Sequence, residues 1–168
     1  MAATATSPQY DNQQTSKRIE AYDAGKVRCA SFEYVNNGTA DKPAGVKLIT
    51  LPAGKVRVIP QLSAIWVSEN GADESFVDGS VIDVGYALYN EPDGTEKSAD
   101  DDYWVVDFNP ASTHEKRFAL PAGGGAADVG MPKVFNTKSG LTITMDVETQ
   151  DMKVGAKVYG EIFFVQGN

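Results

Sequence analysis

Apolar and polar side chains alternate with a period of two along most of the chain after residue 25. The clearest segment is 141–148, in which every odd position is apolar and every even position is polar or charged. Successive side chains of a strand point to opposite faces, so this alternation predicts a half-buried β-strand. Residues 154–166 predict a second, longer strand. The inward-facing residues expected in these two strands are Leu141, Ile143, Met145, Val147, Val154, Ala156, Val158, Ile162 and Phe164.

Shorter runs of the same kind precede them, separated by turn sequences. The further strands predicted are 26–36, 45–51, 55–69, 80–90, 103–108 and 117–120. The turn sequences are Asn36-Asn37-Gly38, Pro52-Ala53-Gly54, Glu91-Pro92-Asp93-Gly94 and Asn109-Pro110. Glycine supplies positive φ and proline presets φ, so both residues favour turns at these places.

Three positions predict irregularities within strands. Pro60 has no N–H to donate, so we expect a bulge, a break or an edge within 55–69. Gly155 and Gly160 interrupt the last strand and predict bulges. In 80–90, the residues expected on one face are Ile82, Val84, Tyr86 and Leu88.

The element pattern predicts an all-β fold. No segment of ten or more residues shows a helical period, and alternation of strands with helices is absent, which argues against a parallel α/β sheet. About eight strands at a spacing of roughly ten residues are typical of an antiparallel two-sheet β-sandwich of jelly-roll or Greek-key type. We assign residues 25–168 to this one domain.

Residues 1–24 lack this pattern and are mostly polar. Such a segment has little core of its own, so we predict an extended, flexible N-terminal arm. The arm can instead become ordered on a neighbouring subunit. The candidate residues for an interface with a neighbouring subunit are Tyr10, Arg18, Ile19 and Tyr22.

Charge and targeting signals narrow the range of partners. The formal net charge is -8, and no basic run is longer than Lys17-Arg18, so phosphate backbones and anionic lipids would be repelled. We therefore expect no nucleic-acid partner and no membrane partner. The start lacks the features of a signal peptide, and no apolar run reaches transmembrane length. We expect a protein made in the cytoplasm, with its single cysteine, Cys29, buried and unpaired.

Candidate catalytic residues are few. The single histidine, His114, lies in a polar segment, and nothing in the sequence brings it to a nucleophile and a carboxylate. One histidine and one cysteine do not make a zinc site. Gly123-Gly124-Gly125 lacks the Lys-Ser/Thr ending of a phosphate-binding loop. We expect no enzyme activity, no cofactor and no metal.

Acidic and aromatic residues leave two interpretations open. Asp100-Asp101-Asp102 offers oxygen ligands that suit calcium, but the EF-hand pattern is missing and an exposed acidic loop is the better interpretation. Trp66, Tyr103 and Trp104 would serve as a surface aromatic site for sugar, whereas burial in the sandwich core is the more ordinary role of such residues.

The order of these pieces resembles a known class of protein. Leu51-Pro52-Ala53-Gly54 joins two strands, Ser80–Tyr86 follows, an aspartate-rich insert runs into Asp102-Tyr103-Trp104, and a long strand over 153–166 closes the chain. Over residues 17–166 this is similar to the small β-rich virion proteins of tailed bacteriophages, some of which are decoration (cement) proteins of the head.

The resemblance implies a function as well as a fold. It implies a virion structural protein, often a homotrimer, that binds the major capsid protein on the capsid exterior and stabilises the head. It carries no catalytic residues. The alternative is a tail-fibre or host-recognition module of the virion that binds surface glycan through its aromatic residues.

Overall fold

The computed structural model describes residues 26–38, 42–68, 80–109, 116–119, 122–123 and 133–167. All regular secondary structure in these ranges is β-strand. Accordingly, no helix there has the length and apolar character that crossing a membrane requires. The structure confirms the predicted all-β class.

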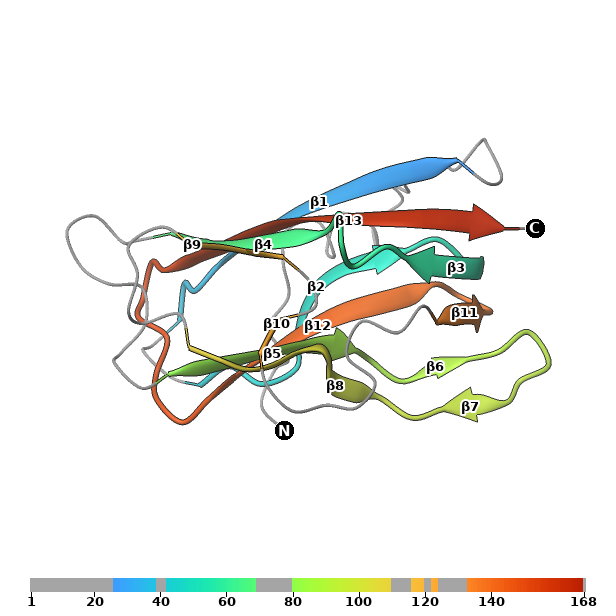
Figure 1. Ribbon diagram of the computed structural model, residues 1–168. Helices are drawn as coiled ribbons and strands as arrows, with labels where there is room; N and C mark the ends of the chain where they lie inside the picture. Colours follow the sequence, from blue (N-terminus) through green and yellow to red (C-terminus); the bar gives the residue numbers. More distant parts are fainter. Residues whose placement is uncertain are drawn as a thin grey trace.

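One sheet, here called sheet B, is organised around the long C-terminal strand (Figure 1). On one side, residues 157–165 of strand β13 pair with β1. On the other side, residues 157–161 pair with β4 and residues 164–167 pair with β3. Strand β11 extends the sheet beyond β3, and β9 extends it beyond β4. The strands of sheet B are β1 (Val27–Val35), β3 (Gly54–Val58), β4 (Ala64–Ser68), β9 (Lys116–Ala119), β11 (Val134–Thr137) and β13 (Lys157–Gly167).

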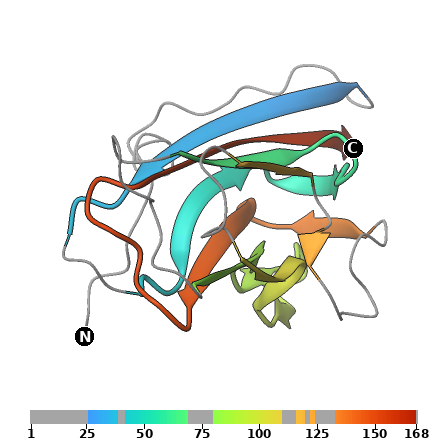
Figure 2. The same ribbon diagram turned by 60° about the vertical axis from the view of Figure 1, so that its left-hand side comes forward.

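The second sheet, sheet A, has the order β10-β8-β5-β12-β2. Its strands are β2 (Val46–Leu51), β5 (Val81–Tyr86), β8 (Asp100–Phe108), β10 (Ala122–Gly123) and β12 (Leu141–Glu148). All described pairs are antiparallel except the short pair β8–β10. The two sheets form opposite layers, with β1 and β13 in one and β2 and β12 in the other (Figure 2).

The core lies between these layers, where the alternating apolar residues meet. All four inward residues predicted for β12 are buried, as are four of the five predicted for the last strand. The largest side chains that are almost fully buried include Trp104 from sheet A and Phe135 and Phe164 from sheet B. Each sheet therefore buries the face that its period-two pattern predicts.

Several strand ends differ from the predictions. The predicted strand 55–69 breaks at Pro60, where backbone bonds to Ile59 and Pro60 form a turn between β3 and β4. Strand β5 ends at Tyr86, so Leu88 lies beyond it and is half exposed. Val154 is also exposed, because β13 begins only at Lys157. At both places the apolar–polar alternation of the sequence extends beyond the paired residues. Pairing with a neighbouring strand decides where a strand ends.

The predicted bulge at Gly160 is wrong. Gly160 keeps a regular register with Phe32 and Ile65. A Cβ there would lie 2.6 Å from the Phe32 ring, so glycine makes room for that ring. Gly155 lies in the turn before the strand, with φ of 82°. The described register shifts fall between Ile143 and Thr144 and along the β5–β8 pair.

Two turns contain more interactions than their sequences indicate. At the predicted Asn36-Asn37-Gly38 turn, the buried Asn36 side chain donates to the carbonyl oxygens of Met152 and Lys153 and so anchors the loop before β13. At the Glu91–Gly94 turn, Gly94 N–H donates to the Glu91 carbonyl over 2.9 Å. That turn closes a hairpin of β6 (Tyr89–Asn90) and β7 (Glu96–Lys97).

Candidate functional site

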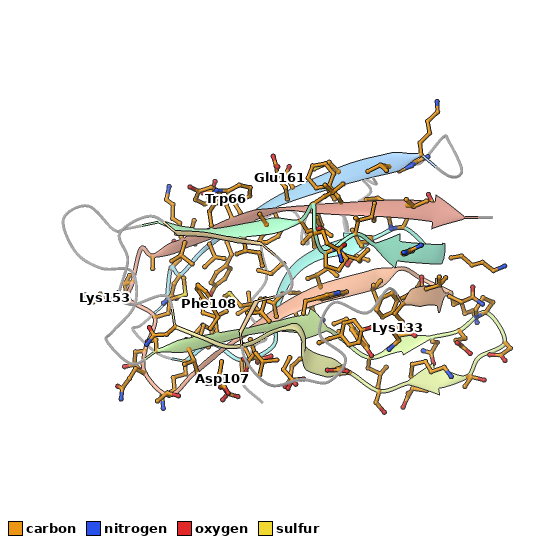
Figure 3. The ribbon with its side chains drawn as sticks, in the orientation of Figure 1. Trp66, Asp107, Phe108, Lys133, Lys153 and Glu161 are labelled. Atoms are coloured by element: carbon orange, nitrogen blue, oxygen red, sulfur yellow. The ribbon has the colours of Figure 1, made fainter. Side chains whose placement is uncertain are left out.

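The outward faces of the two sheets carry different chemistry. Alternation in β5 and β12 turns Asp83, Asp146 and Glu148 away from the core on sheet A. On sheet B, the outward face presents Trp66 and Tyr159. Asp107 and Trp66 project from opposite sides of the sandwich (Figure 3). The sandwich therefore has an acidic face on sheet A and an aromatic face on sheet B.

Three strands bring a group of carboxylates together on the acidic face. One oxygen each from Asp83 (β5), Asp107 (β8) and Glu148 (β12) lies within 4.8 Å of the others. Asp83 is only 7% exposed and accepts a hydrogen bond from the backbone N–H of Asp107 at 2.6 Å. Asp107 has φ of 49°, a left-handed conformation that aspartate tolerates better than most residues. The arrangement holds a buried carboxylate beside two exposed ones.

Burial and neighbouring negative charge make the ionised form of Asp83 unfavourable. Loss of hydration is the largest cause and raises its pKa from 3.8 to about 6, with smaller contributions from Glu148, Asp107 and Asp102. The hydrogen bond from Asp107 N–H acts in the opposite direction. Asp146, which pairs with Asp83 across β5 and β12, also has a pKa raised by burial. At neutral pH the ionised carboxylates of Asp83 and Asp146 are therefore less favourable in the folded protein than in water.

This group differs from the acidic site considered in the sequence. Asp100-Asp101-Asp102 is the start of β8 and not a loop, and burial and Asp102 raise the pKa of Asp100. Carboxylate oxygens are suitable ligands for a hard cation, so Asp83, Asp107 and Glu148 are the described residues that would hold one. Sequence reasoning missed them because they lie on three separate strands. The available signal was Asp83, an aspartate between apolar residues of a predicted strand.

Replacing Asp83 with asparagine is expected to stabilise the protein at pH 8. Asparagine keeps the oxygen that accepts the Asp107 hydrogen bond and removes the charge. The folded state binds more protons than the unfolded state between pH 3.8 and about 6, so the stability of the wild type decreases as pH rises through this window. We expect a gain of about 1–2 kcal/mol at pH 8 after solvent screening, vanishing near pH 4, measured by urea unfolding.

Asp93→Asn is the matched control. Its carboxylate accepts a hydrogen bond from Thr95 N–H at 2.8 Å, and that bond lowers its pKa. The folded state therefore favours the ionised form, so this variant is expected to lose stability at pH 8. Equal effects of Asp83→Asn at pH 4 and pH 8 would contradict the assignment of Asp83 as an unfavourable charge.

The aromatic face of sheet B centres on a stacked pair. The rings of Trp66 (β4) and Tyr159 (β13) are 5.7 Å apart and parallel within 2°. Both side chains are partly exposed, and Phe163 and Val165 lie further along the same face of β13. Exposed Val27 and Cys29 oppose Val165 and Phe163 across the β1–β13 pair. The expected burial of Cys29 is thus wrong, because odd positions of β1 face outward.

Tyr103 and Trp104 do not belong to this surface. Trp104 is 1% exposed and Tyr103 is 8% exposed, so core burial is confirmed for both and the surface interpretation is wrong. They lie in an aromatic cluster whose ring centroids are 5.0–6.0 Å apart. The other members of this cluster are Tyr86, Tyr89 and Phe135.

Lys133 packs against three rings of this aromatic cluster. Its ammonium lies 4.7–5.0 Å from three of the ring centroids and donates to the Tyr86 hydroxyl at 2.6 Å. Burial raises the pKa of Tyr86 to about 12, so the hydroxyl stays protonated. The cation is held by ring faces and one hydroxyl, a cation–π arrangement that stabilises the sandwich at this end. The cluster is therefore structural.

The remaining candidate residues lie outside the described ranges. These are the interface candidates Tyr10, Arg18, Ile19 and Tyr22, the histidine His114, and two residues of the glycine run, Gly124 and Gly125. Their assignments stay predictions. The domain boundary near residue 24 also stays a prediction.

Comparison with known proteins finds chains of similar structure but no protein of similar sequence. No family model matches the sequence, and no curated protein matches it. A chain in the structure of the capsid of Ralstonia phage GP4 is similar, with a TM-score of 0.61 and 17% identity over 98% of this chain and 99% of that chain. A chain in the capsid asymmetric unit of cyanophage Pam1 gives a TM-score of 0.55 and 13% identity over 90% and 95%. At these identities the likeness establishes a shared fold.

Proposed function

We propose that this protein is a structural component of a tailed-bacteriophage virion, which binds the outside of the assembled capsid and stabilises the head as a decoration protein. The observation that carries the proposal is the end-to-end likeness to a chain of a phage capsid structure, covering 98% of this chain and 99% of that one. The two chains are therefore of similar length. The proposal assigns no catalytic role to any residue.

The two outward faces are suited to this role in different ways. A contact surface needs apolar side chains that can be removed from water, and sheet B offers Trp66, Tyr159 and Phe163. The acidic face of sheet A is suited to solvent, where like charge keeps particles apart. We therefore propose that sheet B faces a protein neighbour in the particle.

Assembly would multiply weak contacts. Linking several binding modules raises the effective concentration of each one without new contacts. A homotrimer on the major capsid protein, with Tyr10, Arg18, Ile19 and Tyr22 from residues 1–24 at the interface, would use this effect. The trimer and these interface residues are part of the proposal.

Binding to purified heads tests the proposal. Purified protein is mixed with heads that lack it, or with unassembled capsid subunits, and each mixture is sedimented and analysed by mass spectrometry. We expect saturable binding to heads and none to free subunits, and a higher temperature for DNA release from the decorated heads. Presence only in tails, or absence from native particles, would refute the proposal.

The alternative of a glycan-binding virion module rests on one observation, the exposed Trp66–Tyr159 stack. Sugar rings bind to flat aromatic faces, and the planes of these two rings are parallel within 2°. A glycan array on the wild type and on Trp66→Ala decides it. A hit that disappears in the variant supports a host-recognition role, and an array without hits removes it.

A further inference from the structure

We infer that the first half of β1 is a docking site for the N-terminal segment, residues 1–25, of a second copy of this chain. The inference rests on the proposed function, because a segment exchanged between copies serves a protein that acts as an assembly. It adds the place of contact and the residue that would hold the segment.

The first observation is a strand edge. Among the described strands, β1 pairs with β13 alone and forms the border of sheet B. An edge strand directs alternate N–H and C=O groups away from its neighbour, which makes it a template for a further strand. The stretch Val27–Ser31 has no described strand along this edge. Addition of an extended segment there would use main-chain hydrogen bonds.

The second observation is one buried donor atom of an arginine, for which the described part of the chain supplies no acceptor. Arg28 lies on the inner side of β1, the side of the buried residues Ala30 and Phe32. Its Nε is buried and has no hydrogen-bond partner among the residues that the structure describes. A buried donor left unsatisfied destabilises the protein, so an arriving acceptor would remove this unfavourable contribution. A carboxylate is the preferred acceptor, because it can bind the guanidinium with two parallel hydrogen bonds.

The third observation is the apolar surface beside this edge. Val27 is 54% exposed, and Cys29 is exposed next to Phe163 and Val165 on the outer face. Within the described ranges, the site therefore combines a strand edge without a further partner strand, a buried guanidinium nitrogen without an acceptor, and an apolar strip. Its occupant must be extended and must carry both a carboxylate and apolar side chains.

Residues 1–25 have these properties. They end at Gly25, one residue before Lys26 and two before β1, and contain Glu20 and Asp23 close to Ile19 and Tyr22 in the sequence. Twenty-five extended residues span up to about 80 Å, whereas the eleven residues of β13 span about 36 Å. An extended segment of this length is therefore long enough to contact a second copy of the chain. Its own β1 follows it immediately, so only a sharp reversal at Ala24-Gly25 would return it to that strand.

The native cysteine provides the test. Light and isotopically heavy protein are unfolded together and refolded, and Cys29, the single cysteine, is labelled with a thiol-reactive photo-crosslinker. Burial, and to a lesser degree Glu161, raise the pKa of the Cys29 thiol, so labelling is done at mildly alkaline pH. We expect crosslinks from Cys29 of one isotope to residues 1–25 of the other. The matched control is Cys29→Ser/Ser98→Cys, which carries the probe at an exposed residue near the β6–β7 hairpin.

Charge reversal tests the role of Arg28. Arg28→Glu should lower the yield of mixed-isotope crosslinks about tenfold, as expected for loss of a charge-assisted bond, and Glu20→Arg/Asp23→Arg in the same chain should restore it. The milder Arg28→Gln should lower the yield without changing the melting temperature. Crosslinks only within one copy, no crosslinks to residues 1–25, or an unchanged yield in Arg28→Glu would each overturn the inference. The test uses no capsid, so failure of capsid binding is a separate result.

Discussion

Replacing Trp104 with alanine is expected to lower the free energy of unfolding by about 3–5 kcal/mol. Trp104 is 1% exposed and packs against Tyr103, Tyr86 and Phe135 at centroid distances of 5.2, 6.0 and 5.9 Å. Phe135 belongs to sheet B, so the indole helps to join the two sheets. Its removal leaves a cavity between rigid sheets, which can close only in part. Urea unfolding followed by circular dichroism measures the loss.

Trp66→Ala is the matched control for this prediction. Trp66 is partly exposed and stacks on Tyr159 at the surface, so its loss should cost only about 1–2 kcal/mol. The comparison also matters for function. A Trp104 variant that fails to bind glycan or capsid would report loss of the fold, whereas a Trp66 variant reports on the surface. Equal losses of stability would contradict the assignment of Trp104 to the core.

Replacing Gly85 with alanine is expected to destabilise the protein by about 3 kcal/mol or more. A Cβ at Gly85 would lie 1.9 Å from the Asp100 carbonyl oxygen and 2.5 Å from the Asp101 carbonyl carbon. Both contacts are to backbone, so no side chain can move aside. The start of β8 would have to separate from β5, where the register is already irregular. Thermal unfolding should show a large decrease in Tm.

Gly38→Ala serves as the control for the glycine substitution itself. Among the described residues, a Cβ at Gly38 would meet only the Asn36 Oδ1, at the ordinary distance of 3.6 Å. This variant should unfold within a few tenths of a kcal/mol of the wild type. If Gly85→Ala were equally mild, the close approach of β8 to β5 would be wrong.

Much of the fold could be predicted because period-two alternation records burial directly. Leu141, Ile143, Met145 and Val147 are all buried, as predicted, and Gly54 turns the chain with φ of 101°. These features depend on neighbours along the chain. Strand ends were less predictable, since Leu88 and Val154 continue the pattern but lie beyond the last paired residues. The strand pairing that ends a strand comes from residues far away in the sequence.

The candidate sites depended more strongly on tertiary structure. The acidic group of Asp83, Asp107 and Glu148 forms because β5 lies between β8 and β12. The sequence instead indicated Asp100–Asp102 as the candidate acidic site, because these acidic residues are adjacent in the chain. Adjacent acidic residues on a strand point alternately to opposite faces, so nearness in sequence does not place them together.

The sequence by itself determined that this chain folds into antiparallel strands with one buried face each, because alternation requires only the two-residue repeat of an extended backbone. Tertiary structure alone decided which aromatic residues are buried and which are exposed. Trp104 and Trp66 each lie beside a valine or isoleucine in a strand, yet Trp104 is buried between the sheets and Trp66 faces outward. The reason is that a strand defines two faces, and only packing against a second sheet selects the one that leaves water.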